Sequence, residues 1–382
     1  MTGAAVIVVG GGVIGTAIAW RAAAAGHPVT LIDPGTDDKA SLVAAGMLGP
    51  VSESVFGEQD LLALNLHAIE RFPAFNTELE AASGRRTGLR TEGTLAVAYD
   101  SGDQAALDRL TEFRHSIGLK AERLDAKACR RLEPFLAPST RGGVLATGDL
   151  SVDNRRYLAA LRTAAGAAGV TTVVGQVTEV GAGHVRYVVD KEAIEAPAGH
   201  VVVAAGWSTG KIAGIPDQVS KAIRPVKGQI LRLRHPRSLP PLLTHTVRAL
   251  VQGRDIYLVP RADGELVVGA TQEERDDRDI TAGAVHDLLR DAMTAVPAIS
   301  ELILAETSAG RRPGTSDNGP ILGLLGGLDP ADPADQKGPI IAAGHFRNGV
   351  LLSAVTADAV ATLLDGGRPH QAWSPFYPGR FA

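Results

Sequence analysis

Residues 5–33 read AVIVVGGGVIGTAIAWRAAAAGHPVTLID, and this stretch decides the fold class. The apolar run Ala5–Val9 is typical of a parallel strand that is buried on both faces. The alanine-rich segment Val13–Ala25 favours a helix, and a glycine follows it. Val29–Ile32 has the character of a second strand, which ends at Asp33. The stretch therefore predicts one complete βαβ unit.

Three glycines in the first turn of this unit form the motif Gly10-x-Gly12-x-x-Gly15. The first glycine permits a tight turn, the second lets a pyrophosphate approach the backbone, and the third lets the helix pack on the strand. The phosphates would lie at the positive N-terminus of the helix. Asp33 has the spacing of an acid that binds an adenosine ribose. The unit predicts a bound dinucleotide but does not distinguish NAD from FAD.

Later segments predict a second kind of sheet. Val201–Ala205 and Ile340–Ala343 are apolar and extend the parallel sheet, whereas Gln229–Leu233 and Glu265–Val268 alternate as antiparallel strands do. The stretch GLDPADPADQKG at 327–338 predicts a surface loop. We expect an α/β fold: a Rossmann-like FAD- or NAD-binding domain interrupted by an antiparallel-sheet-rich α+β substrate domain. The predicted dinucleotide-binding domain comprises 1–91, 148–222 and 308–382, and the substrate-binding domain comprises 92–147 and 223–307.

The composition narrows the class of protein. The 382 residues include 38 Lys and Arg and 42 Asp and Glu, so the net charge of −4 gives no electrostatic reason to expect nucleic acid or an anionic membrane as a partner. No apolar run approaches the roughly 20 residues of a membrane span. The single cysteine, Cys129, fits a reducing cytoplasm, and the histidine spacing gives no support for a zinc site. We expect a cytoplasmic protein without a metal.

An arginine pair is a candidate for binding a carboxylate. The stretch AGRRPGTSDNGPILG at 309–323 places Arg311 and Arg312 before a Pro-Gly turn. A guanidinium can hold a carboxylate through two parallel hydrogen bonds, which fixes its direction as well as its charge. The residues alone leave open a solvated arginine pair. They favour Tyr257, in IYLVP, as a core aromatic with its hydroxyl at the sheet edge.

Three small-residue segments are candidates for contacting the ring system of a cofactor. They are SLVAAGMLGP at 41–50, VVVAAGWS at 201–208 and GHFRNGVLL at 344–352. Glycine-rich backbone near the C-terminal ends of parallel strands is where ligands lie in open α/β sheets. A second helix is predicted to begin near Asn348-Gly349, where free amides suit an electron-rich ring edge. Plain loops and an ordinary helix start are the alternatives.

Together these stretches resemble the D-amino-acid oxidase family of FAD-dependent amine oxidases, and within it the glycine oxidases of thiamine biosynthesis. The matching segments run in family order from VVGGGVIGTAIAW at 8–20 to AAGHFRNGVLLSAVTA at 342–357. The resemblance implies FAD, hydride transfer from the substrate Cα to flavin N5, and dioxygen as acceptor. It implies that glycine or a small amine such as sarcosine gives an imine and then an oxo acid, ammonia and hydrogen peroxide. A homotetramer and a role in forming the thiamine thiazole are also implied.

The resemblance also assigns roles to residues. It implies that Arg312 clamps the substrate carboxylate, that Tyr257 hydrogen-bonds the same group, and that Arg347 shapes substrate entry or flavin electrostatics. Arg311 is expected to point elsewhere. The expected cofactor-binding residues are Gly10, Gly12, Val13, Ile14, Gly15, Asp33, Ala44, Ala45, Gly46, Met47, Val177, Gly206, His345, Arg347, Asn348, Gly349, Val350 and Leu351.

Two departures from the glycine-oxidase pattern fall where we expect specificity to be set. Asp255 stands where a histidine is usual, and Gln272 where an apolar residue is usual. Polar side chains at these positions would admit a larger or more polar amine. A broader D-amino-acid oxidase or dehydrogenase is therefore one alternative. A non-catalytic FAD-binding subunit is the other.

Overall fold

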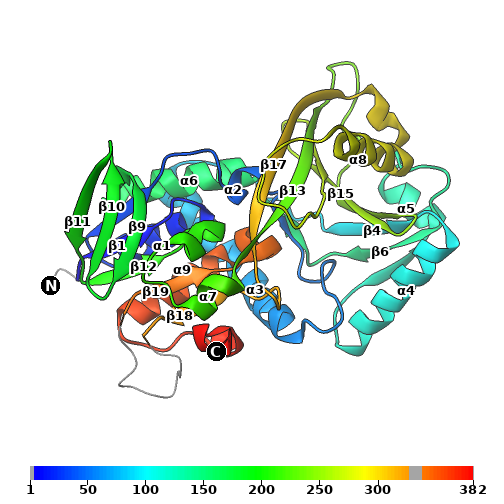
Figure 1. Cartoon of the computed structure of the whole chain (residues 1–382). Helices are drawn as coiled ribbons and strands as arrows, with labels where there is room; N and C mark the ends of the chain where they lie inside the picture. Colours follow the sequence, from blue (N-terminus) through cyan, green and yellow to red (C-terminus); the bar gives the residue numbers. More distant parts are fainter. Residues whose placement is uncertain (1–3, 327–337, 382) are drawn as a thin grey trace.

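A six-stranded sheet forms the centre of one half of the molecule. Figure 1 shows the computed structural model, which describes residues 4–326 and 338–381. The strand order is β18-β19-β12-β1-β2-β8, and all neighbouring pairs are parallel except β18 with β19. The loop predicted at 327–338 lies outside the described residues except for Gly338. The strands are β1 (Val6–Val9), β2 (Val29–Asp33), β8 (Thr171–Val174), β12 (His200–Val203), β18 (Ile321–Leu324) and β19 (Ile340–Ala343).

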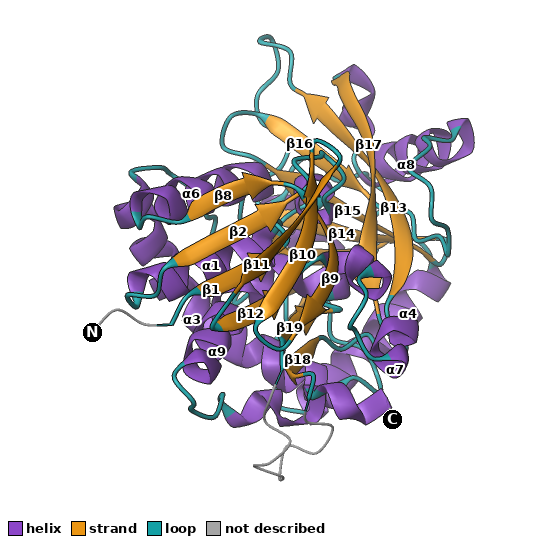
Figure 2. Cartoon of the chain, turned by 60° about the vertical axis from the view of Figure 1, so that its left-hand side comes forward, coloured by secondary structure: helices purple, strands orange, loops and turns teal. Residues whose placement is uncertain are grey.

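The two faces of this sheet are covered differently. Val6 and Val8 of β1 pack into a core shared with helices, whereas Ile7 and Val9 pack into a core shared with a three-stranded sheet. This alternation is the period-two pattern of a strand buried on both faces. Figure 2 shows the three-stranded sheet on one side and the helices on the other. The covering elements are α1 (Val13–Ala24), α3 (Gln59–Ser83), α6 (Asn154–Ala167), α9 (Gly349–Leu364), β9 (Gln176–Gly181), β10 (His184–Val189) and β11 (Glu192–Pro197).

An eight-stranded sheet forms the other half (Figure 1). Its order is β17-β13-β16-β15-β14-β4-β6-β5, and the pair β14 with β4 is parallel. Helix α8 packs on one face and contributes Leu288, Ala292 and Ala295 to the core. The elements are β4 (Thr94–Ala98), α4 (Ser101–Ser116), β5 (Glu122–Asp125), α5 (Ala126–Leu132), β6 (Gly142–Ala146), β13 (Arg224–Arg234), β14 (Thr246–Val251), β15 (Arg254–Pro260), β16 (Glu265–Gly269), α8 (Ala282–Ala295) and β17 (Ile303–Gly314).

One predicted boundary differs from the structure. The sequence predicts a domain boundary at residue 308. In the structure, β17 continues to pair with β13 as far as Gly314, which lies opposite Arg224. Arg312 therefore belongs to the eight-stranded sheet. None of the described helices is long and apolar enough to cross a membrane. The remaining elements are α2 (Ala40–Val43), β3 (Met47–Leu48), β7 (Leu150–Ser151), η1 (Gly206–Lys211), α7 (Asp217–Ala222), η2 (Pro297–Glu301), η4 (Phe346–Asn348), η5 (Gln371–Phe376) and η6 (Pro378–Phe381).

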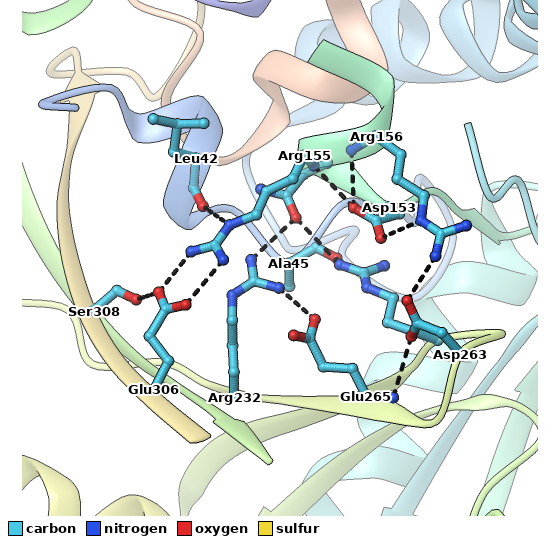
Figure 3. A network of polar contacts seen from close by, with 12 residues as sticks. Leu42, Ala45, Asp153, Arg155, Arg156, Arg232, Asp263, Glu265, Glu306 and Ser308 are labelled. Carbon is cyan, nitrogen blue, oxygen red and sulfur yellow. Dashed lines mark hydrogen bonds and ion pairs between the residues drawn. The ribbon is translucent and has the colours of Figure 1, made fainter. Parts of the chain in front are cut away.

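A polar network joins the eight-stranded sheet to α6 and to the segment that follows α2 (Figure 3). Arg155 of α6 donates to both carboxylate oxygens of Glu306 in β17, at 2.9 and 2.5 Å, and also to the Leu42 carbonyl at 3.2 Å. Ser308 donates to the same carboxylate. A bidentate pair fixes direction as well as charge. Because Arg155 binds both Glu306 of β17 and the Leu42 carbonyl of α2, it positions β17 relative to α2.

Two buried arginines complete the network. Arg261 donates to the carbonyls of Val152 at 2.8 Å and Ala45 at 2.6 Å, and to Asn154 Oδ1 at 3.3 Å. Arg232 donates to the same Asn154 oxygen at 3.3 Å. Burial lowers the pKa of Arg261 to about 10, so this side chain remains charged at neutral pH. Both arginines come from the eight-stranded sheet and both meet the start of α6.

The Arg155–Glu306 pair predicts a pH dependence of stability. The hydrogen bonds from Arg155 lower the pKa of Glu306 from 4.5 to about 2. Because the pKa is lower in the folded state, the stabilisation is fully present above pH 4.5 and is lost as the pH falls towards 2. We expect Glu306→Gln to lower the Tm by roughly 1–2 °C at pH 7, since the pair is partly exposed. The difference from wild type should shrink below pH 4.

Differential scanning fluorimetry across pH 3–8 checks this prediction. Asp263→Asn is the matched control, because Asp263 also pairs with an α6 arginine, Arg156, at 2.7 Å, but both of these side chains are nearly half exposed. The control should change the Tm less than Glu306→Gln does. A Tm difference for Glu306→Gln that grows on acidification would contradict the assignment.

Candidate active site

A cavity of about 770 Å³ lies between the C-terminal edge of the six-stranded sheet and the eight-stranded sheet. It is lined by the glycine turn at 10–12, by residues 43–47, and by residues 310–313 of β17. Its volume is in the upper part of the range for sites that bury a ligand of drug size or larger. Residues far apart in the sequence therefore meet around one site.

One end of the cavity is built by the glycine turn. A Cβ on Gly15 would lie 1.9 Å from the Gly10 carbonyl oxygen, and Gly10 itself has φ +105°. Gly15 does not line the cavity; it lets α1 pack against the turn, which is the role expected of the third glycine. Asp33 Oδ2 accepts from the Gly11 amide at 2.7 Å, and the Asp33 carboxylate also pairs with Lys39 at 2.9 Å. Asp33 thus lies beside the turn, at the end of β2.

The middle of the cavity is lined by the segment Ala44–Met47, together with Val177 and Gly206. Gly46 has φ +73°, and a Cβ there would lie 2.0 Å from the Val152 carbonyl oxygen. Only glycine fits this position without displacing the backbone. The Ala45 carbonyl accepts from Arg261, so the segment is fixed from the eight-stranded sheet. Its shape is set before any ligand enters.

Arg312 and Tyr257 lie at the other end of the cavity. The Arg312 side chain lies over Gly228 and the Tyr257 side chain over Gly269, both glycines of the eight-stranded sheet. A Cβ on Gly228 would lie 2.3 Å from the Arg312 guanidinium nitrogens, and one on Gly269 would lie 2.4 Å from the Tyr257 hydroxyl. Both side chains therefore lie flat where the sheet has no side chain of its own. Burial raises the pKa of Tyr257, and the neighbouring Arg312 charge opposes that rise. The phenol remains protonated at neutral pH and can donate a hydrogen bond.

The two adjacent arginines have different surroundings. Arg311 pairs with Asp38 and with Asp276, the latter at 2.7 Å, and its guanidinium lies 3.8 Å from the centre of the Trp207 ring. Arg312 donates to the Thr271 carbonyl at 3.2 Å, and no described carboxylate is within ion-pair distance of it. The Arg312 charge is therefore available to an anionic ligand. Arg311 is thus engaged within the protein, and carboxylate binding by Arg312 stays a prediction.

The segment 345–351 contributes some of its expected residues and not others. His345, Arg347, Gly349 and Val350 line the cavity. Asn348 and Leu351 are buried but do not line it, because the short helix η4 and the first turn of α9 direct them into the protein interior. For these two residues the cofactor contact therefore stays a prediction. Burial lowers the pKa of His345 to about 3, so its ring is neutral at physiological pH.

Arg347 has a partner that no pattern in the sequence indicates. Its guanidinium pairs with Glu58, which in turn accepts from the Asn318 side chain at 2.8 Å. Arg347 thus lines the cavity with its charge already balanced. A balanced arginine suits shaping the cavity better than clamping a carboxylate.

Asp255 and Gln272 do not line the cavity. The Asp255 side chain is 71% exposed and lies 3.7 Å from Arg248 on the neighbouring strand. Our expectation that these two side chains shape the substrate pocket is therefore not supported, because Asp255 faces solvent and Gln272 lies outside the lining. Departures at these positions do not by themselves enlarge the site.

Comparisons with known proteins identify the family. Residues 5–363 match the family described as "DAO: FAD dependent oxidoreductase". The chain belongs to this family. It is 34% identical over 367 residues to a glycine oxidase of Geobacillus kaustophilus, covering 94% of this chain and 92% of that protein. A crystal structure of glycine oxidase from the same organism matches with a TM-score of 0.87 and 32% identity, over 100% of this chain and 99% of that one.

A further relative is longer than this chain. The bifunctional protein ThiO/ThiG of Synechocystis is 30% identical over 385 residues, covering 98% of this chain but only 54% of that protein. The present chain therefore spans about half of the length of that relative. As an FAD-dependent oxidoreductase, this protein is an enzyme with FAD as its cofactor.

The residues of the cavity fit FAD. The glycine turn precedes α1, so the positive N-terminus of this helix lies at the end of the cavity where the pyrophosphate would bind. Lys39 lines the same end and supplies a positive charge close to Asp33. The Ala44–Met47 segment and the start of α9 line the remainder. Gly10, Gly11 and Gly12 all line the cavity, so no side chain of the turn occupies the space that the pyrophosphate would need.

Sequence reasoning missed several lining residues of the flavoenzyme. Ser41 accepts from the Val13 amide at 2.9 Å. It belongs to the small-residue segment 41–50, so the position of that segment indicates it as a lining residue. Trp207 follows the predicted strand end directly. Arg278 and Glu53 also line the cavity, but each is brought there by a loop with no local pattern. Only the folded chain reveals these two.

Gly228, which lies under the Arg312 side chain, yields a second prediction. In Gly228→Ala the new methyl group meets the guanidinium of Arg312, which is the far end of a flexible side chain. We therefore expect the fold and bound FAD to be retained while Arg312 is displaced. The KM for an amino-acid substrate should rise about tenfold or more, because small misplacements of a binding group are costly.

Steady-state kinetics and flavin content measure these effects. Gly166→Ala is the control, because a Cβ there meets nothing within 4 Å and the position lies in α6. It should leave KM unchanged. An unaltered KM in Gly228→Ala would show that Arg312 does not depend on this glycine.

Proposed function

We propose that this enzyme oxidises glycine and small N-substituted glycines such as sarcosine, with dioxygen as the electron acceptor. The observation that carries the proposal is the unpaired Arg312 guanidinium beside the Tyr257 phenol, in the same cavity as the dinucleotide turn. The similarity to glycine oxidases supports the choice of substrate. Bound FAD, held by the glycine turn and the Ala44–Met47 segment, would supply a two-electron acceptor for oxidation of the substrate Cα, with dioxygen as the final acceptor and hydrogen peroxide as the product.

The protein side chains bind and orient the substrate. The Arg312 fork accommodates a carboxylate in two hydrogen bonds, and the Tyr257 hydroxyl can donate a third. Because both side chains lie flat on the sheet, the carboxylate is held in one plane and the rest of the substrate is directed into the cavity. Holding a reactant in one orientation is a large part of catalysis in such enzymes. The imine formed from glycine hydrolyses to the oxo acid and ammonia, and the imine formed from sarcosine hydrolyses to the same oxo acid and methylamine.

We further propose that the enzyme serves formation of the thiamine thiazole and that it is a homotetramer. The first statement is supported by the similarity to the ThiO/ThiG proteins. The second rests on the resemblance to the family. Neither the Arg347 site nor the flavin turn requires a second copy of the chain. Light scattering on the purified protein measures the oligomeric state.

Substitution of the clamp tests the proposed binding mode. We expect Arg312→Met to raise the KM for glycine at least about 100-fold, because a charged, bidentate partner is lost from a partly buried site. Arg312→Lys should have a smaller effect, since it keeps the charge and loses the fork. Flavin content should be unchanged in both variants. An unchanged KM in Arg312→Met would remove this residue from the substrate site.

Peroxide release from the yellow protein tests the substrate class. Glycine, sarcosine, N-ethylglycine, D-alanine and D-proline are offered in parallel. Highest kcat/KM with glycine or sarcosine supports the proposal. Preference for D-alanine or D-proline would instead indicate a broader D-amino-acid oxidase. Absence of peroxide, with no anaerobic bleaching of the flavin, would indicate a non-catalytic subunit.

A further inference from the structure

A carboxylate lies at the substrate end of the cavity and has no role in the function described above. Glu53 lines the cavity that also contains Arg312 and Tyr257, and its side chain is only 14% exposed. Burial is the largest cause of the raised pKa of Tyr257. Of the nearby charges, Arg312 lowers this pKa and Glu53 raises it. The field of Glu53 therefore reaches the group that faces the substrate.

The turn that carries Glu53 is rigidly built. The Glu53 amide donates to the Gly49 carbonyl at 2.9 Å. The buried Asp149 carboxylate accepts from the Val51 and Ser52 amides, each at 3.1 Å. These bonds connect the turn to the β6–β7 connection, about a hundred residues along the chain. The backbone at Glu53 is thus fixed by the fold.

The charges around Glu53 do not neutralise it completely. Arg248 lies 3.4 Å from Glu53 and also 3.7 Å from Asp255, so one guanidinium serves two carboxylates. The other charged groups packed on the turn are Arg114, which donates to the Ser52 carbonyl at 2.8 Å, and Asp149. They have opposite signs. With Arg114 and Asp149 both ionised, the group as a whole carries a net negative charge.

The other two acids of the described lining lie away from Arg312 and Tyr257. Asp33 pairs with Lys39, and Asp38 with Arg311, both toward the dinucleotide end. Among the described lining residues this leaves Glu53 as the carboxylate at the substrate end. A zwitterionic amino acid brings one carboxylate for Arg312 and one ammonium, which Glu53 attracts. A second acidic group on the substrate would meet Glu53 as a like charge.

We propose that Glu53 sets the charge selectivity of the substrate site, favouring amino acids with a single carboxylate and excluding those with a second acidic group next to the amine. This inference rests on the proposed function, because it takes Arg312 as the anchor of the first carboxylate. Specificity then comes from a repulsive element as well as from the clamp. Glu53 acts as a specificity-determining residue.

Two ethers without an amine test the inference by binding alone. Methoxyacetate has the shape of sarcosine with one carboxylate, and diglycolate carries a second one. Each is titrated into the holoenzyme, and Kd is obtained from the change in flavin absorbance. For wild type we expect diglycolate to bind at least about tenfold more weakly than methoxyacetate, since juxtaposed like charges are costly. In Glu53→Gln this ratio should fall at least about fivefold, mainly through tighter binding of diglycolate.

Asp255→Asn is the matched control. It removes the same charge from the same partner, Arg248, but Asp255 does not line the cavity. The control should leave the ratio of the two Kd values within about twofold of wild type. Glu53→Ser, which retains no carboxylate, should shift the ratio in the same direction as Glu53→Gln. Retained flavin absorbance shows that each variant is folded.

The outcomes separate this inference from the proposed function. An unchanged ratio in Glu53→Gln, with methoxyacetate still bound, overturns the role of Glu53 alone. An equal effect in Asp255→Asn also overturns it, because the selectivity would then come from a remote field. Methoxyacetate binding that is unaffected by Arg312→Met overturns the proposed clamp, and the inference that rests on it fails as well.

Discussion

The buried guanidinium of Arg261 is the contact on which the geometry of the active site depends. It directly follows strand β15 of the eight-stranded sheet, and its acceptors are the carbonyl of Ala45, which lines the cavity, the carbonyl of Val152, and Asn154 Oδ1 at the start of α6. Each buried polar group left without its partner would cost about 1–3 kcal/mol, and more where a charge is involved. The two halves of the molecule therefore have one favoured relative position. The cavity exists because that position is fixed.

Charge is distributed unevenly along this cavity. Toward the dinucleotide, acids and bases are paired with each other, as in Asp33 with Lys39 and Arg311 with Asp38. At the substrate end, Arg312 has no described carboxylate partner, and Glu53 shares Arg248 with Asp255. Paired charges stabilise a permanently bound cofactor site, whereas unpaired charges are available to a ligand that must enter and leave. The arrangement matches a retained cofactor and an exchanging substrate.

The sequence predicted what depends on local pattern. The βαβ unit at 5–33 follows from periodicity and glycine spacing, and the structure places β1, α1 and β2 within a residue or two of the predicted bounds. The roles of Arg312 and Tyr257 came from the resemblance to a family, since an arginine pair alone is ambiguous. The structure adds the reason, because Arg311 is paired and Arg312 is not.

What the sequence could not predict depends on contacts between distant residues. Glu53 reaches the cavity because Asp149, 96 positions later, binds the turn before it. Glu58 balances Arg347 across 289 positions. Asn348 and Leu351 are buried beside lining residues, because a helix directs successive side chains to different sides. Asp255 lies two residues before Tyr257 in the sequence, but in the fold its side chain faces solvent.

The anchoring of the 49–53 turn has a consequence for how such enzymes diversify. Because Asp149 holds the turn, and the flavin segment is held separately by Arg261, the two parts of the site can change independently. A substitution at Glu53 alters the charge that meets the substrate without touching the bonds that shape the cofactor segment. On the proposed role of Glu53, a single substitution in this turn is therefore a short route to a different charge preference that leaves the Arg261 contact with the Ala45 carbonyl in place.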